Sequence, residues 1–159
     1  DKMRGVVAMG IRNENEARMR GEVREALLGR VRMFPLGNFS INVVSNFGVQ
    51  AMNASLMARA KFRFMAITDS SLIEEDELYR RGLLDPAWVA GWRARLVPWR
   101  APVELLLDGH DSLIAECDDE DADQARGLMQ DAMCQDVTVQ GMPMHYTAKA
   151  RIARRASEL

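Results

Sequence analysis

Residues 103–117 read VELLLDGHDSLIAEC, and this stretch decides the fold that the sequence predicts. It holds an apolar run, a short link containing Asp and Gly, and a second apolar run. Two apolar segments joined in this way are typical of a β-hairpin. The hairpin would place His110 and Asp111 at its tip, where a carboxylate can meet a metal ion or a substrate. A turn without any chemical role is the alternative for this stretch taken alone.

The size and composition of the chain fit one domain or a large piece of one. It has 159 residues, of which 48% are hydrophobic, so a real core can form. No apolar run is long enough to span a membrane, and the N-terminus has no signal-peptide layout. The missing initiator Met suggests a trimmed or fragmentary chain. Cys117 and Cys134 are predicted to be reduced core thiols of a cytoplasmic protein.

Charge is unevenly distributed along the sequence. Up to Arg63 there are 11 Lys and Arg residues against 5 Asp and Glu, and from Phe64 onward there are 10 against 18. A basic half is the electrostatic footprint expected for a phosphate-backbone partner. An acidic half that includes an active-site carboxylate suits a divalent cation. Ordinary solvated surface is the alternative, and the two histidines, His110 and His145, cannot supply a His-rich metal centre.

Periodicity predicts helices and antiparallel strands without a repeating strand–helix–strand rhythm, so the predicted class is α+β. Gly29 is a plausible end for the first helix, and Pro35 for the first strand. An apparent insertion at about residues 68–100 is expected to hold two helices, the second of which would start at Pro86. The predicted helices cover residues 14–28, 45–66, part of 71–80, 86–96 and 118–133; the predicted strands cover 30–35, the hairpin of 103–117 and 144–150.

The long helix over residues 45–66 carries a row of amides. Asn46, Gln50 and Asn53 follow one another at steps of four and three residues, so they share a face. A plain solvent surface would more often carry Glu and Lys, and an internal polar contact is the bland alternative. The three tryptophans lie in the insertion, and we expect Trp88, Trp92 and Trp99 to pack rather than to stack on bases.

Three short blocks, taken in order, resemble the C-terminal part of a family A DNA polymerase, the bacterial DNA polymerase I type, including its phage members. Residues 29–35, GRVRMFP, are similar to the family's Gly-Arg-Arg…Pro strand after the fingers. Residues 46–55, NFGVQAMNAS, are similar to its Asn-x-Pro-x-Gln-Gly-x-Ala-Ala-Asp helix start. Residues 107–112, LDGHDS, are similar to the Val-His-Asp-Glu of motif C. The match covers roughly residues 23–150, interrupted by the insertion.

The resemblance implies an antiparallel palm sheet with a motif C hairpin packed against long helices. Residues 1–28 would end the fingers subdomain, and residues 29–159 would form the palm, with a helical Trp-rich insertion at about 68–100. The implied activity is template-directed DNA synthesis by two-metal nucleotidyl transfer. Its partners would be primer-template DNA and deoxynucleoside triphosphates, with no membrane. The expected location is the cytoplasm, which would be the host's if the protein is encoded by a phage.

The resemblance also assigns roles to single residues. Asp111 matches the motif C carboxylate and is the expected Mg²⁺ ligand and catalytic residue, and His110 would lie near the primer terminus. Asn46 and Gln50, with Asn53 on the same face, would donate to minor-groove acceptors that every base pair presents at similar positions. Two arginines, Arg30 and Arg32, would hold backbone phosphates, which positions DNA without reading sequence.

Departures from the family pattern bear on activity. Ser112 replaces the Glu that usually follows the motif C Asp, Asn42 stands where an Arg is common, and Ala51 and Ser55 replace Gly and Asp. The family's other Asp, on the first palm strand, and its nucleotide-binding fingers helix have no match in the sequence. Part of the Mg²⁺ site is therefore expected from a second polypeptide or from a missing N-terminal segment.

Two other functions remain open at this stage. The first is a catalytically degenerate polymerase module that only binds nucleic acid or a replication partner. The second is an unrelated α+β domain, for example a metal-dependent phosphohydrolase that uses the His-Asp pair.

Overall fold

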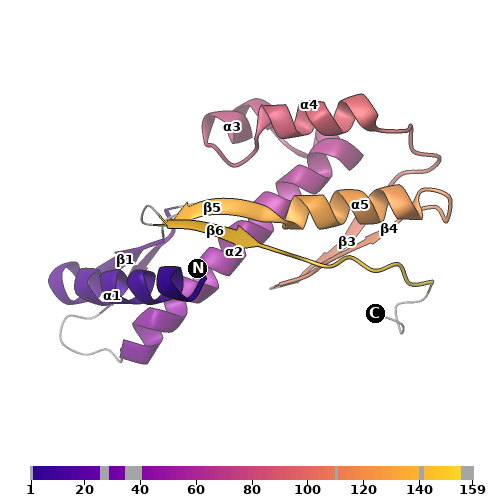
Figure 1. The fold of residues 1–159 in the computed structure, drawn as a ribbon. Helices are drawn as coiled ribbons and strands as arrows, with labels where there is room; N and C mark the ends of the chain where they lie inside the picture. Colours follow the sequence, from indigo (N-terminus) through magenta and orange to yellow (C-terminus); the bar gives the residue numbers. More distant parts are fainter. Residues whose placement is uncertain (1, 26–28, 35–40, 110, 140–141, 155–159) are drawn as a thin grey trace. The chain divides into compact units, whose positions relative to one another are not determined.

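The computed structural model describes residues 2–25, 29–34, 41–109, 111–139 and 142–154 (Figure 1). The chain forms two compact units, one of residues 1–56 with 136–146 and the other of residues 57–135 with 147–159. The elements in chain order are α1 Lys2–Arg20, β1 Glu22–Arg24, β2 Val31–Met33, α2 Ile41–Thr68, the 3-10 turn η1 Ser70–Leu72, α3 Glu75–Arg80, α4 Pro86–Arg95, β3 Glu104–Asp108, β4 Leu113–Glu116, α5 Ala122–Met133, β5 Gln135–Val139 and β6 Met142–Tyr146.

The predicted α+β class is confirmed. The described strands form three two-stranded sheets, in which β1 pairs with β2, β3 with β4 and β5 with β6. Each strand therefore pairs with its neighbour in sequence, and no sheet contains a crossover. The division into fingers and palm stays a prediction, because the two compact units describe packing and not subdomain identity.

The first helix ends earlier than predicted. It was expected over residues 14–28 with Gly29 as its stop, but α1 begins at Lys2 and Gly21 ends it. Gly21 has φ 67°, a left-handed conformation that glycine adopts without a Cβ clash, and its N–H donates to Ala17 O at 3.1 Å. The chain then turns back into β1, whose Val23 is fully buried.

Two hydrophobic clusters form the interior of the first unit. One contains Ala17, Val23, Phe34 and Val44, with Phe47 packed against it. The other contains Met52, Leu56, Val137 and Met144, with Val49 and Tyr146 packed against it. The first half of α2 contributes to both clusters, as the apolar spacing of the long predicted helix indicates. That helix is longer than predicted by a few residues at its start and two at its end.

The insertion folds into α3 and α4, and α4 begins at Pro86 as predicted. The Asp85 carboxylate caps α4 by accepting from Ala87 N at 2.9 Å. Trp88 and Trp92 follow at a four-residue step, with ring centroids 6.1 Å apart. The guanidinium of Arg63 lies 5.2 Å from the Trp88 ring, and that of Arg95 lies 4.0 Å from the Trp92 ring. These contacts support the packing role expected for the tryptophans.

Both C-terminal predictions need correction at their bounds. The helix expected over 118–133 is α5, which starts at Ala122, because Asp118 Oδ1 accepts from Glu120 N at 3.1 Å and forms a turn first. The strand expected over 144–150 is β6, which ends at Tyr146. Residues 147–150 are not part of a strand. Within them, Ala148 N donates to Cys134 Sγ at 3.4 Å instead of to a carbonyl of a neighbouring strand.

Cys117 and Cys134 are free thiols, as predicted, but both are half-buried rather than in the core. Among the described residues, no helix combines the length and the apolar character that crossing a membrane requires.

The second unit should be sensitive to loss of its central aromatic side chain. Phe64 on α2 is fully buried, so Phe64→Ala is expected to lower the free energy of unfolding by about 3–5 kcal/mol. Leu72→Ala is the control, because Leu72 is 64% exposed. Urea denaturation of both variants measures the difference. Equal destabilisation by the two substitutions would contradict the assigned core.

Candidate functional site

The stretch 103–117 folds into the predicted antiparallel hairpin. Strands β3 and β4 pair with Glu104 opposite Glu116 and Asp108 opposite Leu113. Val103 and Leu113 are buried and anchor the hairpin, while Gly109 N donates to Ser112 O at 2.7 Å and closes the turn. Asp111 lies in this turn and is exposed. His110 lies outside the described residues, so its expected place near a primer terminus stays a prediction.

An irregularity in β3 changes which side chains face outward. The register shifts between Leu105 and Leu107, so Leu106 is an extra residue on this strand. Leu106 and Leu107 are 56% and 53% exposed despite lying in a strand. A groove of about 720 Å³ between β3 and the second half of α2 includes both of them. Bulges of this kind bend a strand and redirect its side chains near functional sites.

The described residues fit part of a Mg²⁺ site and no more. They include no group of three or more His, Cys, Asp or Glu side chains arranged to hold a metal ion. Mg²⁺ needs only one or two protein carboxylates, with water and substrate phosphates completing its octahedron. An exposed carboxylate at a hairpin tip, such as Asp111, fits that requirement once a second oxygen ligand arrives from elsewhere.

The amide row expected on the long helix lies on α2. Gln50 is exposed and Asn53 is half-buried, and both are available on the surface of the first unit. The side chain of Asn46 lies outside the described part of the structure. Helical spacing puts all three on one face, and exposed amides can donate to an acceptor such as a base edge.

The two arginines assigned to phosphate contacts lie at β2. Arg30 and Arg32 are both exposed, and the Arg32 guanidinium lies 5.5 Å from the Phe34 ring centroid and 5.8 Å from that of Phe47. This aromatic pair, whose rings meet edge to face, holds the Arg32 side chain in place. The guanidinium can still reach an anion, since the residue is exposed.

The candidate residues fall into two groups. Arg30, Arg32, Gln50 and Asn53 belong to the first compact unit, and Asp111 belongs to the second. The DNA-contacting candidates therefore share one unit, and the candidate metal ligand lies in the other.

Sequence reasoning missed a buried pair beside the amide row. Ser55 is fully buried, and its hydroxyl lies 3.0 Å from Glu25 Oε2 and 2.9 Å from Ala51 O, both within hydrogen-bonding distance. Glu25 is itself only 4% exposed. The serine that stands in place of the family's Asp thus contacts the side chain of Glu25, which follows β1, and an Asp at this position would put two carboxyl groups in contact. No local pattern could reveal this pair, because its members are 30 residues apart.

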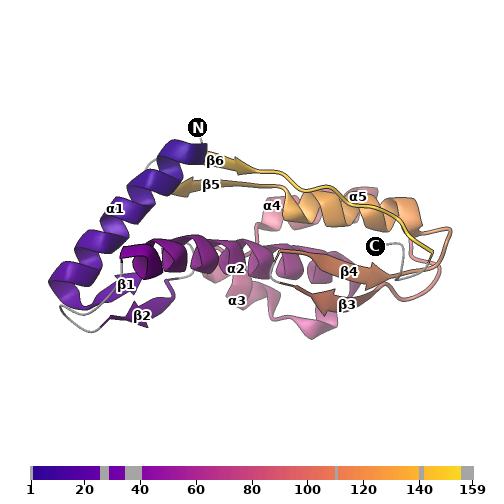
Figure 2. The same cartoon turned by 90° about the horizontal axis from the view of Figure 1, so that it is seen from below.

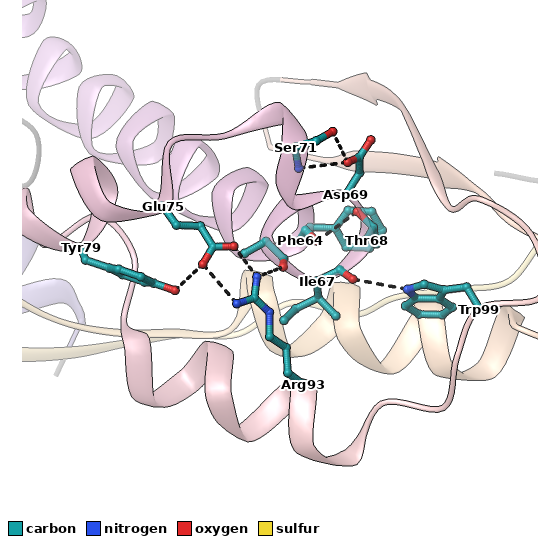
Figure 3. Close-up of polar contacts among 10 residues, drawn as sticks. Phe64, Ile67, Thr68, Asp69, Ser71, Glu75, Tyr79, Arg93 and Trp99 are labelled. Carbon is teal, nitrogen blue, oxygen red and sulfur yellow. Dashed lines mark hydrogen bonds and ion pairs between the residues drawn. The ribbon is translucent and has the colours of Figure 1, made fainter.

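The end of α2 is held by side chains from the insertion (Figure 3). The last carbonyls of a helix have no partner within the helix. Arg93 Nη2 donates to Ala66 O at 2.9 Å, and Trp99 Nε1 donates to Ile67 O at 3.4 Å. A guanidinium is also favoured at the negative end of the helix dipole. The clustered tryptophans were the one sequence signal that the insertion packs against its surroundings.

Glu75 and Tyr79 complete this network and shift each other's titration. The Glu75 carboxylate accepts from the Arg93 guanidinium and from Tyr79 Oη, the latter at 2.7 Å. Burial acts to raise the pKa of Glu75, but the hydrogen bonds from Arg93 and Tyr79 and the Arg93 charge outweigh it, so the pKa is lowered. Burial, with the hydrogen bond to Glu75 and the Glu75 charge, raises the pKa of Tyr79 to about 12.

The comparisons identify no relative of this protein. Neither protein-family models, nor curated protein sequences, nor solved structures give a match to the chain.

The lowered pKa of Glu75 gives a testable dependence on pH. A carboxyl group with a folded-state pKa below its unfolded value of 4.5 stabilises the fold above that value and loses this contribution as pH falls through the folded pKa. Wild type should therefore exceed Glu75→Gln in thermal stability at pH 7. The difference should shrink as the pH is lowered below 4.5.

Thermal midpoints of both proteins across this pH range measure the effect. Glu74→Gln is the matched control, because Glu74 is exposed and its side chain makes no capping hydrogen bond at α3. A difference between wild type and Glu75→Gln that grows in acid would contradict the network.

Proposed function

We propose that this chain is the palm-bearing part of a family A DNA polymerase. It would be active when joined to the part that carries the second Asp and the fingers helix; the joined protein is called the complete assembly below. The observation that carries the proposal is the β3–β4 hairpin, which presents Asp111 in an exposed turn. The resemblance of residues 107–112 to motif C calls for a carboxylate at this point.

The order of elements gives further support. The hairpin is followed by α5 and then by the strands β5 and β6. The resemblance implies a helix after the hairpin and then a last strand, to which α5 and β6 would correspond. It is preceded by α2, which carries exposed Gln50, and by β2 with exposed Arg30 and Arg32. A palm-type sheet would arise when the missing part adds its strand. The described hairpin alone has two strands, which is marginal for an isolated sheet.

In the proposed reaction a primer 3′-hydroxyl attacks the α-phosphate of a deoxynucleoside triphosphate, and pyrophosphate leaves. Bound Mg²⁺ would lower the pKa of the attacking hydroxyl and neutralise charge on the leaving group. Asp111 would hold this cation with one carboxylate, the other being supplied from outside the chain. Arg30 and Arg32 would position the DNA backbone, and the amides of Gln50 and Asn53 would test base-pair geometry from the minor groove.

A catalytically degenerate module is the second candidate function. It is favoured by Ser112, which follows Asp111 where the family usually has Glu. Such a module would bind DNA or a replication partner through the same basic and amide residues. Metal-dependent nucleotide incorporation by the complete assembly would exclude it.

Removal of the motif C carboxylate tests the proposal. In the complete assembly, Asp111→Ala should abolish primer extension, because several kcal/mol of charge stabilisation corresponds to at least about a thousandfold in rate. DNA binding should survive, because a carboxylate and the DNA phosphates are both negatively charged and Asp111 makes no favourable contact with them. Asp76→Ala, which removes another exposed carboxylate, is the matched control. Retained extension by Asp111→Ala would overturn the assignment.

The arginines of β2 give an independent test of the DNA interface. A phosphate contact made by one arginine releases counterions, so Arg30→Ala and Arg32→Ala should each weaken DNA binding and reduce the slope of log K against log salt by about 0.9. Fluorescence anisotropy over a salt series measures both quantities. Arg81→Ala, which removes an exposed arginine of the acidic half, should leave the slope as in wild type. An unchanged slope in both β2 variants would remove these arginines from the interface.

A further inference from the structure

Arg59 on α2 is a half-buried arginine to which the described part of the chain offers no partner. Its Nε is sealed from solvent and has no hydrogen-bond acceptor. Among the residues that the structure describes, none accepts a hydrogen bond from its guanidinium or forms an ion pair with it. Burial lowers the pKa of Arg59, and no acidic group acts against this effect. The positive charge therefore lies partly out of water without compensation.

The next arginine on the same face of the helix makes the contacts that Arg59 lacks. Arg63 follows Arg59 by one helical turn, so their side chains are neighbours on α2. Arg63 Nη1 donates to Cys134 O, at the end of α5, at a distance of 3.2 Å. The Arg63 guanidinium also lies 5.2 Å from the Trp88 ring centroid. All of these residues belong to the second unit, and within it the guanidinium of Arg59 has no such contacts.

An arginine in this state is a cost to the fold that a ligand would offset. A charge removed from water is costly unless it is paired, and its replacement by an apolar side chain is often neutral or stabilising. Nε alone is buried without an acceptor, so the two Nη atoms of Arg59 remain within reach of solvent. They can donate two parallel hydrogen bonds to the oxygens of one anion.

We propose that Arg59 binds a phosphate group, carried by the DNA backbone or by the incoming nucleotide. Phosphate is favoured because the first 63 residues, which include Arg59, carry 11 Lys and Arg against 5 Asp and Glu. The source of the phosphate rests on the proposed function, whereas the unpaired guanidinium does not. The second unit would thereby gain an anion-binding residue of its own, since Arg30 and Arg32 lie in the first.

Binding of two phosphate-bearing probes to the 159-residue chain tests the proposal. The probes are a short primer-template duplex and a deoxynucleoside triphosphate, and isothermal titration measures their affinities. Arg59→Met keeps an unbranched stem and removes the guanidinium, so it should weaken binding by about tenfold to a hundredfold, the usual contribution of hydrogen bonds to a charged group. Arg59→Lys keeps the charge without the two parallel donors and should lose less.

Arg81→Met is the matched control, because Arg81 lies in the same unit and is exposed. It should bind both probes as wild type does. An effect of Arg59→Met on the duplex alone would assign a backbone phosphate to Arg59, and an effect on the triphosphate alone would assign the nucleotide. An effect on both would mean that they share the site. If Arg59→Met binds both probes as tightly as wild type, the proposal is wrong.

Thermal unfolding without a ligand provides a readout apart from binding. Arg59→Met should raise the midpoint of unfolding by about 2–4 °C, because it removes an unpaired charge from a partly buried place. Arg81→Met should leave the midpoint unchanged. A lower midpoint in Arg59→Met would reveal a partner for the guanidinium within the chain and would overturn the proposal. So would normal probe binding by Arg59→Met combined with lost association with the missing part of the polymerase, which would assign Arg59 to a protein carboxylate.

Failure of the proposed function gives a different pattern. Extension that survives Asp111→Ala in the complete assembly would remove the polymerase assignment, while duplex binding that depends on Arg59 would still support the phosphate site. Loss of extension in Asp111→Ala, together with probe binding that is independent of Arg59, would retain the polymerase and reject the phosphate site. The two ideas are therefore separable in one set of variants.

Discussion

The carbonyl groups at the end of α2 impose the constraint on which the second unit depends. A helix of 28 residues leaves its last carbonyls without partners in the helix, and burying them unpaired would be costly. Arg93 and Trp99 supply donors, and both come from the insertion. The insertion is thereby fixed to the end of α2. The Glu75 carboxylate accepts from the Arg93 guanidinium and from Tyr79 Oη, so the cap is a network (Figure 3).

The hairpin obeys a different constraint, because a two-stranded sheet is marginal without support. Buried Val103 and Leu113 anchor it, and residues of β3 and of the second half of α2 line one groove, with the two elements alongside each other in Figure 2. Its tip remains exposed, and β3 carries two exposed leucines. Under the proposed polymerase function, the segment that carries the second Asp would add its strand to this two-stranded sheet and its carboxylate beside the exposed Asp111.

Structural features that depend on neighbouring residues were predicted well from the sequence. Features that depend on contacts between residues far apart in the chain were not. The Asp-Gly turn of the hairpin and Pro86 at the start of α4 act within a few residues, so the sequence sufficed for both. The end of α1 was misplaced because Gly21 and Gly29 both take the left-handed conformation, and it is Gly21 whose N–H donates to Ala17 O and closes the helix. The Glu25–Ser55 pair and the Arg93 cap of α2 join residues far apart in sequence, so no periodicity predicts them. Among the site residues, Asp111, Gln50, Arg30 and Arg32 were all found exposed, which their expected roles require.

We propose that this chain works as one part of a larger polymerase. The most direct test is a native mass of the protein isolated from its own source, with every associated polypeptide sequenced. The account predicts a species larger than 17.9 kDa, whose additional sequence contains the second metal-binding Asp and a nucleotide-binding fingers helix. A lone species of 17.9 kDa, with neither element on any partner, would contradict it.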